Sequence, residues 1–366
     1  MSRLSFYNLP AIESLRRELR LDPHDLRKAR TALLKRFASD REMIGALPED
    51  RRRRFLQRVR LHALTLDRRC DSQHDGATKL LFRTDAAMLI ETVVLRVASG
   101  RTALCVSSQV GCAAACDFCA TGKMGVAHNL TADEIVDQVV QAGQLLRAEN
   151  RRVRNIVFMG MGEPFHNEQE LYDALQRIQA PEFFHHAPSK ILVSTVGLPD
   201  AMLRCARRFE RVNLALSLHS VRQEVRERLI PLARRYPLDE IRAAVMQLNA
   251  IQPAATRVMV EYLMVAGVND SADDARELIE WLAGLRAHVN LIPYNSIDDA
   301  PHLSGTDRAG RDAFAALLKQ RNIPTTIRYS LGSDIAAACG QLVRHENRRR
   351  RQVAERSLRE LPIADL

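Results

Sequence analysis

Short apolar runs and amphipathic stretches alternate through the second half of the chain. Each apolar run is short enough for a buried strand, and stretches with helical periodicity separate the runs. The predicted strands are Ile156–Met159, Ile191–Val193, Leu214–Leu216, Val258–Tyr262, Val289–Ile292 and Thr325–Tyr329. Helices are predicted at Leu238–Leu248, Ser271–Leu285 and Arg308–Gln320. This alternation predicts an α/β fold with a parallel sheet that has too few units for a closed eight-stranded barrel.

The segment before these units has a different pattern. Apolar runs at 80–82, 88–94 and 102–106 are separated by turn-like residues, which predicts an antiparallel β-hairpin lead-in over residues 78–108. Further on, Thr131 and Glu134 have the spacing of a capping box at a helix start. We expect the lead-in and the α/β units to form one core over residues 76–345.

The N-terminal part is basic and has helical periodicity. Ile12, Leu15 and Leu19 recur at helical spacing between arginines, and Arg51–Arg54 precede an apolar pair. We predict a small helical accessory domain over residues 1–75 whose basic face contacts RNA phosphates. An arginine-rich tail at 346–366 carries no fold signal.

Charge and composition narrow the class of protein. A net charge of +10 and a pI near 9.6 favour a polyanionic partner, although a solvated arginine-rich surface has the same composition. No apolar run reaches the roughly 18 residues of a membrane span, and the N-terminus lacks the apolar core of a secretory signal. Seven cysteines, an odd number, argue against a disulfide framework. A cytoplasmic protein with no membrane partner is therefore expected.

Three cysteines lie close together and suggest a metal centre. Cys112, Cys116 and Cys119 are spaced Cys-x3-Cys-x2-Cys among small residues and glycines, and thiolates suit soft metals. Structural zinc takes four ligands, and no fourth cysteine lies nearby. A four-iron, four-sulfur cluster held by three cysteines would keep one iron open for chemistry. The alternative is a zinc knuckle completed by a distant ligand such as His128.

Polar residues follow the predicted strands, where α/β enzymes bind their ligands. Gly162 lets the backbone approach a ligand closely, and Glu163 offers a carboxylate to an ammonium group. Ser194, Ser217 and His219 end the next two strands. Each of these residues, taken singly, could equally be a helix cap or a buried hydrogen-bond partner.

The cysteine spacing is the signature of the radical S-adenosylmethionine (SAM) superfamily, and a longer set of segments resembles the RlmN/Cfr family of radical SAM RNA adenosine methyltransferases. These segments lie at 104–112, 119–122, 158–164, 217–220, 290–295 and 332–342. The resemblance implies a partial (β/α)6 barrel and a [4Fe-4S] cluster on Cys112, Cys116 and Cys119. It places SAM contacts on Gly162, Glu163, Ser194, Ser217, Leu218, His219 and Asn295, with Asn290 as the alternative to Asn295.

The same resemblance implies roles for three further residues. Cys339 would take a methyl group from SAM as S-methylcysteine, and Cys105 would release the methylated product by forming a transient disulfide with Cys339. Glu91 would accept the proton of the adenine ring; alternatively, it is a strand-face charge paired with an arginine. In isolation, either cysteine would be taken for a small buried residue.

The implied substrate is an adenosine of 23S ribosomal RNA, methylated at C2 or C8, and some members also modify a tRNA. Leu331 stands where C2-methylating members tend to carry arginine, and the segments 119–122 and 194–197 look nearer to C8-methylating members. The target carbon therefore stays open. A reducing electron donor such as flavodoxin and a monomeric state are also expected. Two alternatives are a radical SAM enzyme with another substrate, which would not need Cys105 and Cys339, and a non-catalytic, metal-stapled RNA-binding protein.

Overall fold

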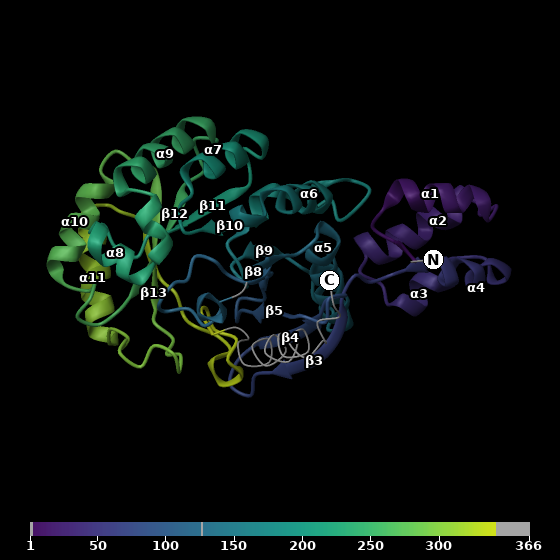
Figure 1. The fold of residues 1–366 in the computed structure, drawn as a ribbon, viewed down its shortest axis with the longest axis horizontal. Coiled ribbons are helices and arrows are strands. Elements are labelled where there is room, and N and C mark those ends of the chain that lie inside the picture. The colour runs from purple at the N-terminus through teal and green to yellow at the C-terminus, as the bar shows by residue number, and fades with distance from the viewer. Residues whose placement is uncertain (1–2, 126, 342–366) are drawn as a thin grey trace, which may run out of the picture.

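A single ten-stranded sheet runs through most of the protein (Figure 1). The computed structural model describes residues 3–125 and 127–341, so the predicted tail at 346–366 lies outside the described residues. The strand order is β14-β13-β12-β11-β10-β9-β6-β5-β4-β3. The bounds are β3 Thr65–Asp71, β4 Ala77–Arg83, β5 Leu89–Arg96, β6 Thr102–Cys105, β9 Asn155–Phe158, β10 Ile191–Thr195, β11 Asn213–Ser217, β12 Val258–Met264, β13 Ala287–Pro293 and β14 Thr325–Ile327.

Strands β6 and β9 to β14 pair in parallel, and the first and last of them are not paired with each other in the described chain. The parallel part is thus an open, partial barrel, which confirms the predicted α/β class. Figure 1 shows helices along its outer side. They are α6 Glu168–Gln179, α7 Pro199–Arg208, α8 Gln223–Leu229, α9 Leu238–Ile251, α10 Ala272–Leu282 and α11 Arg308–Gln320. In the described ranges no helix is long and apolar enough to cross a bilayer.

The remaining strands, β3, β4 and β5, pair antiparallel and join the parallel part through β6. The predicted lead-in at 78–108 is therefore confirmed for β4, β5 and β6. Strand β3 corrects the prediction, because Thr65–Asp71 was assigned to the helical domain at 1–75. Most β3 side chains are exposed, so backbone pairing with β4 forms this edge strand without an apolar alternation in the sequence.

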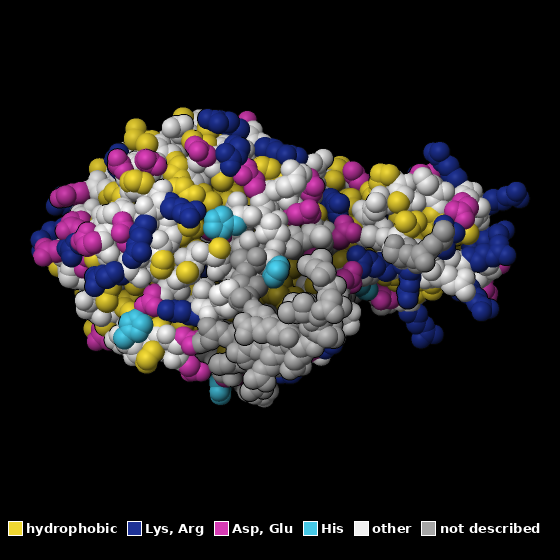
Figure 2. All heavy atoms as spheres, in the orientation of Figure 1, with side chains coloured by type: hydrophobic (Ala, Val, Ile, Leu, Met, Phe, Trp, Pro, Cys, Tyr) yellow, Lys and Arg dark blue, Asp and Glu magenta, His cyan; other side chains and the backbone are white. Residues whose placement is uncertain are grey.

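Four helices form the N-terminal group: α1 Leu9–Glu18, α2 Pro23–Arg30, α3 Asp40–Gly45 and α4 Glu49–Arg58. They enclose a small core that includes Phe6, Leu15 and Phe55, all nearly inaccessible to solvent. The short strands β1 Leu4–Ser5 and β2 Val59–Arg60 pair in parallel beside them. Figure 2 shows many Lys and Arg side chains projecting from this end of the molecule.

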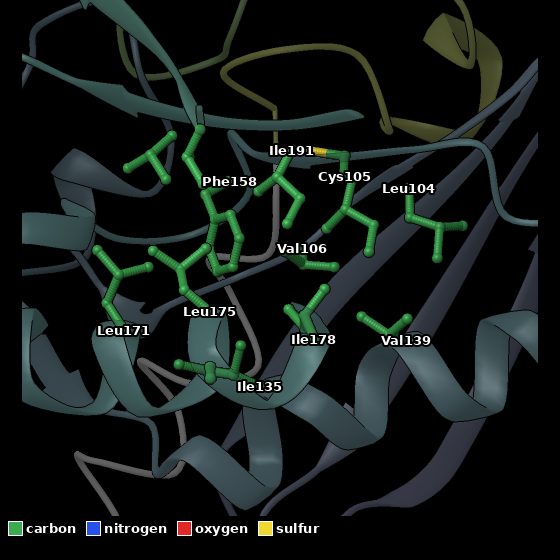
Figure 3. Close-up of a cluster of buried hydrophobic side chains, with 14 of the residues drawn as sticks. Leu104, Cys105, Val106, Ile135, Val139, Phe158, Leu171, Leu175, Ile178 and Ile191 are labelled. Atoms are coloured by element: carbon green, nitrogen blue, oxygen red, sulfur yellow. The ribbon is translucent and has the colours of Figure 1, made fainter. Parts of the chain in front are cut away.

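Helix α5, Ala132–Ala148, lies between the N-terminal helices and the sheet. Thr131 caps it with Glu134 in the predicted capping box. One side of α5 packs with α6 over β6, β9 and β10, and this contact fixes the strands that lead into the site (Figure 3). The side chains labelled there are Leu104, Cys105, Val106, Ile135, Val139, Phe158, Leu171, Leu175, Ile178 and Ile191.

The other side of α5 is joined to the N-terminal group through Asp137, which is inaccessible to solvent. Its carboxylate accepts hydrogen bonds from the Tyr7 hydroxyl at 2.5 Å, His62 Nδ1 at 2.7 Å and the Leu64 backbone N–H at 2.7 Å. The second ring nitrogen of His62 lies 3.0 Å from Asp40 Oδ1. Gln141 of α5 itself donates to the same carboxylate at 3.0 Å, so the buried carboxylate is stabilised mainly, but not only, across the boundary between the helices and the core.

Replacing His62 by glutamine should weaken folding most at pH 6. Burial alone would lower the pKa of His62, but hydrogen bonds to Asp137 and Asp40 outweigh burial and raise the pKa to about 10. The stabilisation is therefore complete below about pH 6.5, the ordinary pKa of histidine, and is lost as the pH rises toward 10. We expect a loss of about 2 kcal/mol in the free energy of unfolding at pH 6 and a smaller loss at pH 10.

Urea unfolding of the wild type and of His62→Gln at both pH values measures this difference. His24→Gln, which alters an exposed histidine, serves as the control. A difference between wild type and His62→Gln that stays constant with pH would contradict the proposed charge on His62.

Candidate active site

The carboxyl ends of the parallel strands surround a cavity of about 150 Å³, hereafter the inner cavity. Its wall combines the cysteine loop with residues that follow β9, β10 and β11. The sequence-predicted residues in this wall are Cys112, Cys116, Cys119, Gly162, Glu163, Ser194, Ser217, His219 and Cys339. Cys112 and Cys339, which are far apart in the sequence, thus line the same cavity.

The three clustered cysteines lie on one tight loop that begins after β7, Gln109–Gly111. A side chain at Gly122 would bring its Cβ to 2.8 Å from the Cys116 backbone nitrogen, so only glycine permits this fold of the loop. Burial raises the pKa of all three thiols, to about 12 for Cys112, and the thiols also repel one another as anions. A positively charged centre would remove this penalty. The donor set therefore fits an iron–sulfur cluster.

The zinc alternative fits less well. His128 lies on β8, Ala127–Asn129, and lines a different cavity together with Arg60 and Thr131. Within 3–125 and 127–341, no three His, Cys, Asp or Glu side chains are arranged around a single ion position. A structural zinc site requires four such ligands around one ion, whereas the cysteines of an iron–sulfur cluster bind different irons.

Glu163 supplies a buried carboxylate to the inner cavity. Its two oxygens accept hydrogen bonds from the backbone N–H groups of Phe165 at 3.1 Å and Val196 at 2.8 Å. Burial raises the pKa of Glu163 to about 7, so a bound ammonium group would favour its ionised form. The preceding Gly162 has φ +105°, and a Cβ there would lie 2.6 Å from the Cβ of Gln109.

His219 presents a fixed N–H group to the inner cavity. Its Nδ1 accepts a hydrogen bond from the Leu263 backbone N–H at 3.0 Å, so the proton of the neutral ring sits on Nε2. Burial, with a smaller contribution from nearby Arg226, lowers the pKa of His219 to about 3. The imidazole is thus a neutral donor at physiological pH. The Phe118 ring packs nearly perpendicular to it, with ring centroids 4.9 Å apart.

The hydroxyls of Ser194 and Ser217 lie 3.4 Å apart at the ends of β10 and β11. Both side chains line the inner cavity. Leu218 differs from them, because its side chain is fully buried and is not part of the cavity wall. Its backbone N–H donates to the carbonyl of Glu261 at 3.0 Å. A cofactor contact at Leu218 stays a prediction.

Arg226, on α8, supports the backbone beside the inner cavity, and sequence analysis did not identify it. The guanidinium is inaccessible to solvent and donates to the carbonyls of Ser217 at 2.9 Å, Leu218 at 2.5 Å and Val196. These carbonyls follow β10 and β11, so one side chain fixes the ends of two strands. Helix α8 also contacts the cysteine loop, since the Leu229 carbonyl accepts from the Asp117 N–H at 2.9 Å.

Replacing Arg226 by methionine should destabilise the fold by about 3 kcal/mol, because buried carbonyls lose their donors. Burial lowers the pKa of Arg226 to about 10, which leaves the wild-type side chain charged near neutral pH. The SAM contacts that the resemblance implies at Ser217 and His219 would lose their support, so SAM binding should weaken roughly tenfold or more. Urea unfolding and calorimetric titration of the cluster-loaded protein measure the two effects.

Arg226→Lys is the matched variant, because it keeps the charge but cannot reach three carbonyls in the same way. Partial recovery of SAM binding in Arg226→Lys would agree with the positioning role. Wild-type SAM affinity in Arg226→Met would contradict it.

A second cavity of about 330 Å³, hereafter the outer cavity, shares part of its wall with the inner one. The shared residues are Met159, Ile292, Arg328 and Cys339. Cys105, at the end of β6, lines only the outer cavity. Cys339 is therefore the one cysteine of the described chain that lines both cavities.

The segment that carries Cys339 is held against the cysteine loop. The Ala120 N–H donates to the Gly340 carbonyl at 2.7 Å, and Asn295 Nδ2 donates to the Cys339 carbonyl at 3.2 Å. Asn295, predicted as a cofactor contact, thus lies beside Cys339 and does not line the inner cavity. Its alternative Asn290 also lies outside that wall and donates to Glu261 Oε2 at 2.7 Å.

Glu91 is almost completely buried on β5 and lines neither cavity. Its Oε1 lies 3.3 Å from Lys79 Nζ, so the ion pair considered for Glu91 exists with a lysine and not with an arginine. The same ammonium group donates to the Ala336 carbonyl at 3.3 Å. Lys79 thereby connects Glu91 to the segment before Cys339. The proton-acceptor role of Glu91 stays a prediction.

Two further charged residues line the inner cavity without having been predicted. Glu261 is buried on β12, and Arg328 follows β14 and also lines the outer cavity. Arg328 Nη1 lies 3.6 Å from Met159 Sδ. A glutamate inside an apolar strand was the available signal for Glu261. No comparable sequence signal marked Arg328, because arginines are frequent along this chain.

Known proteins resemble this chain in sequence and structure. The profile of the Radical SAM superfamily matches residues 106–282. A probable RNA methyltransferase of Rhodopirellula baltica is 55% identical over 94% of this chain and 89% of its own length. A probable dual-specificity RNA methyltransferase RlmN of Thermus thermophilus is 40% identical over 91% of this chain and 95% of its own. The crystal structure of a radical SAM methyltransferase from Sphaerobacter thermophilus superposes with a TM-score of 0.87, at 39% identity, over 93% of this chain and 100% of that one.

Proposed function

Because this chain belongs to the RlmN/Cfr family of radical SAM RNA methyltransferases, we propose that it methylates a ring carbon, C2 or C8, of an adenosine in 23S ribosomal RNA. The observation that carries the proposal is the position of Cys339 in the walls of both cavities. A thiol so placed can accept a methyl group from one cavity and deliver it into the other. The Cys105 thiol, which lines the outer cavity, is the second thiol that the proposed reaction needs.

The inner cavity has the groups needed to hold the cofactors. Cys112, Cys116 and Cys119 would ligate a [4Fe-4S] cluster, and Glu163 would bind the ammonium group of SAM. The His219 N–H and the hydroxyls of Ser194 and Ser217 would donate to its polar atoms. When bound, the cluster and SAM supply a methyl group and a hydrogen-abstracting radical.

The protein residues then carry the methyl carbon to the base. The Cys339 thiolate would bond to the methyl carbon and become S-methylcysteine, while the bond between that carbon and the SAM sulfur breaks and S-adenosylhomocysteine leaves. Loss of one hydrogen atom from this methyl group, to the radical that bound SAM would supply, would let its carbon bond to adenine. Glu91, whose buried charge Lys79 offsets, would then take the ring proton, and the surplus electron would return to the cluster. Attack of the Cys105 thiolate on the Cys339 sulfur would break the sulfur–carbon bond and leave a disulfide; the released carbon keeps the bonding pair and takes up a proton, which gives the methylated base. A dithiol or an equivalent two-electron donor must reduce that disulfide before the next turnover.

Mass spectrometry of RNA nucleosides tests the proposal. RNA from cells with and without the protein is digested, and 2-methyladenosine is separated from 8-methyladenosine. We expect one of the two to depend on the protein. Neither product in ribosomal RNA, despite a protein that contains iron and cleaves SAM under reduction, would favour a radical SAM enzyme with another substrate. A colourless protein with stoichiometric zinc would favour a metal-stapled RNA-binding protein.

The remaining partners follow from chemistry and charge. An acidic, flavodoxin-type reductant would complement the net charge of +10. We also propose a cytoplasmic location, which a ribosomal or transfer RNA substrate and unpaired thiols would fit. A single molecule already contains both cavities, so we propose that it acts as a monomer. Sedimentation analysis and reduction assays with purified flavodoxin test these points.

A further inference from the structure

Tyr329 combines a functional position with unusual exposure. It is 82% exposed, and the other exposed large hydrophobic side chains of the described chain, Leu66, Val97 and Met246, are not aromatic. Tyr329 also lines the outer cavity, together with Cys105 and Cys339. Large aromatic side chains are usually buried, so an exposed one at a cavity mouth points to a partner.

The backbone beside Tyr329 is held in place from within the protein. The N–H of the preceding residue, Arg328, donates to the Leu291 carbonyl of β13 at 2.8 Å. The Arg328 side chain lies in the shared wall of the two cavities. Tyr329 therefore directly follows a residue of the shared wall and itself lines only the outer cavity. Val97, 41% exposed, gives the same cavity a second apolar surface near solvent.

The proposed reaction creates a need for such a side chain. An enclosed site reaches a base only after the base has left its stack, which costs free energy and exposes the face of the neighbouring base. Aromatic side chains stack on exposed bases with little dependence on sequence, because every base has a π face. At 82% exposure Tyr329 lies too far out to enclose the target base itself.

We propose that Tyr329 is a stacking platform for the RNA base next to the target adenosine. This inference rests on the proposed function and adds a contact outside the reacting atoms. The platform acts in binding and in holding the RNA strand at the mouth of the outer cavity. Its loss should therefore raise the KM for RNA and leave the reductive cleavage of SAM in the absence of RNA unchanged.

The test uses the cluster-loaded, full-length protein and an RNA fragment that is a substrate of the wild type. We expect Tyr329→Ala to raise the KM for this RNA about 5- to 100-fold. Tyr329→Phe, which keeps the ring, should stay within about twofold of the wild type. Met246→Ala removes another exposed apolar side chain, 54% exposed on α9, and should have no effect.

A fluorescence readout separates stacking from a general loss of affinity. With 2-aminopurine beside the target adenosine and RNA at saturation, the wild type and Tyr329→Phe should quench its emission more than Tyr329→Ala does. A wild type that methylates RNA, together with unchanged KM and quenching in Tyr329→Ala, would overturn the stacking inference alone. A wild type that methylates no RNA would overturn the proposed function and the inference that rests on it.

Discussion

Replacement of Cys339 by alanine should reduce RNA methylation by at least roughly 10³-fold, the scale of losing a covalent nucleophile. No other cysteine of the described chain lines both cavities, so no other thiol is placed to replace it. The fold should tolerate the change, because the contacts that hold this segment are made by the backbone carbonyls of Cys339 and Gly340. Transfer of a radiolabelled methyl group to RNA measures the loss.

Two measurements identify the step that is lost. Iron content and reductive cleavage of SAM should remain near wild-type values in Cys339→Ala, since the three cluster cysteines are unchanged. Cys70→Ala, on the edge strand β3 and outside both cavities, is the matched control and should methylate normally. Undiminished product from Cys339→Ala would exclude a methylcysteine route.

Replacement of Cys105 by alanine should trap the protein covalently on its RNA. The Cys105 thiol shares the outer cavity with Cys339 and is placed to attack its sulfur. Without this attack the bond between sulfur and the methyl carbon persists, and turnover should stop after one adduct per protein. A denaturing gel with labelled RNA should show a shifted band for Cys105→Ala and none for the double variant Cys105→Ala/Cys339→Ala.

The release step should also depend on pH. Burial, and then the nearby Cys339, raise the pKa of Cys105 to about 12. Thiolate is therefore scarce near neutral pH and becomes more abundant as the pH rises, so release in the wild type should accelerate toward pH 9. Recovery of only free Cys105→Ala protein, with RNA still methylated at the wild-type rate, would contradict the assignment of this residue.

The sequence predicted the parallel part of the fold because each buried strand there is an apolar run between amphipathic helices. Strand β3 was missed because its side chains are mostly exposed and its pairing with β4 comes from backbone groups. Even in the parallel part, the last strand ends at Ile327 and not at Tyr329. The two residues after it, Arg328 and Tyr329, belong to the cavity walls instead.

Site residues were predictable where a sequence motif marks them. They were not predictable where their role depends on contacts between segments that are distant in the sequence. The cysteine spacing and Gly162–Glu163 are motifs, and the structure brings both to the inner cavity. Arg226 looks like a surface charge on an amphipathic helix until carbonyls from two other segments surround it. The sequence could not identify Lys79 as the partner of Glu91, because Lys79 approaches it from the adjacent strand β4.

The buried carboxylate of Asp137 limits which N-terminal helices can be combined with this core. Three of its donors, Tyr7, His62 and Leu64, precede β3, so a core lacking residues 1–64 would keep this buried carboxylate with Gln141 of α5 as its remaining donor. The N-terminal helices therefore cannot be exchanged for those of another protein without regard to Asp137. A chimera with the N-terminal helices of a relative should fold only if equivalents of Tyr7 and His62 are grafted along with them, or if Asp137 is replaced by an uncharged residue.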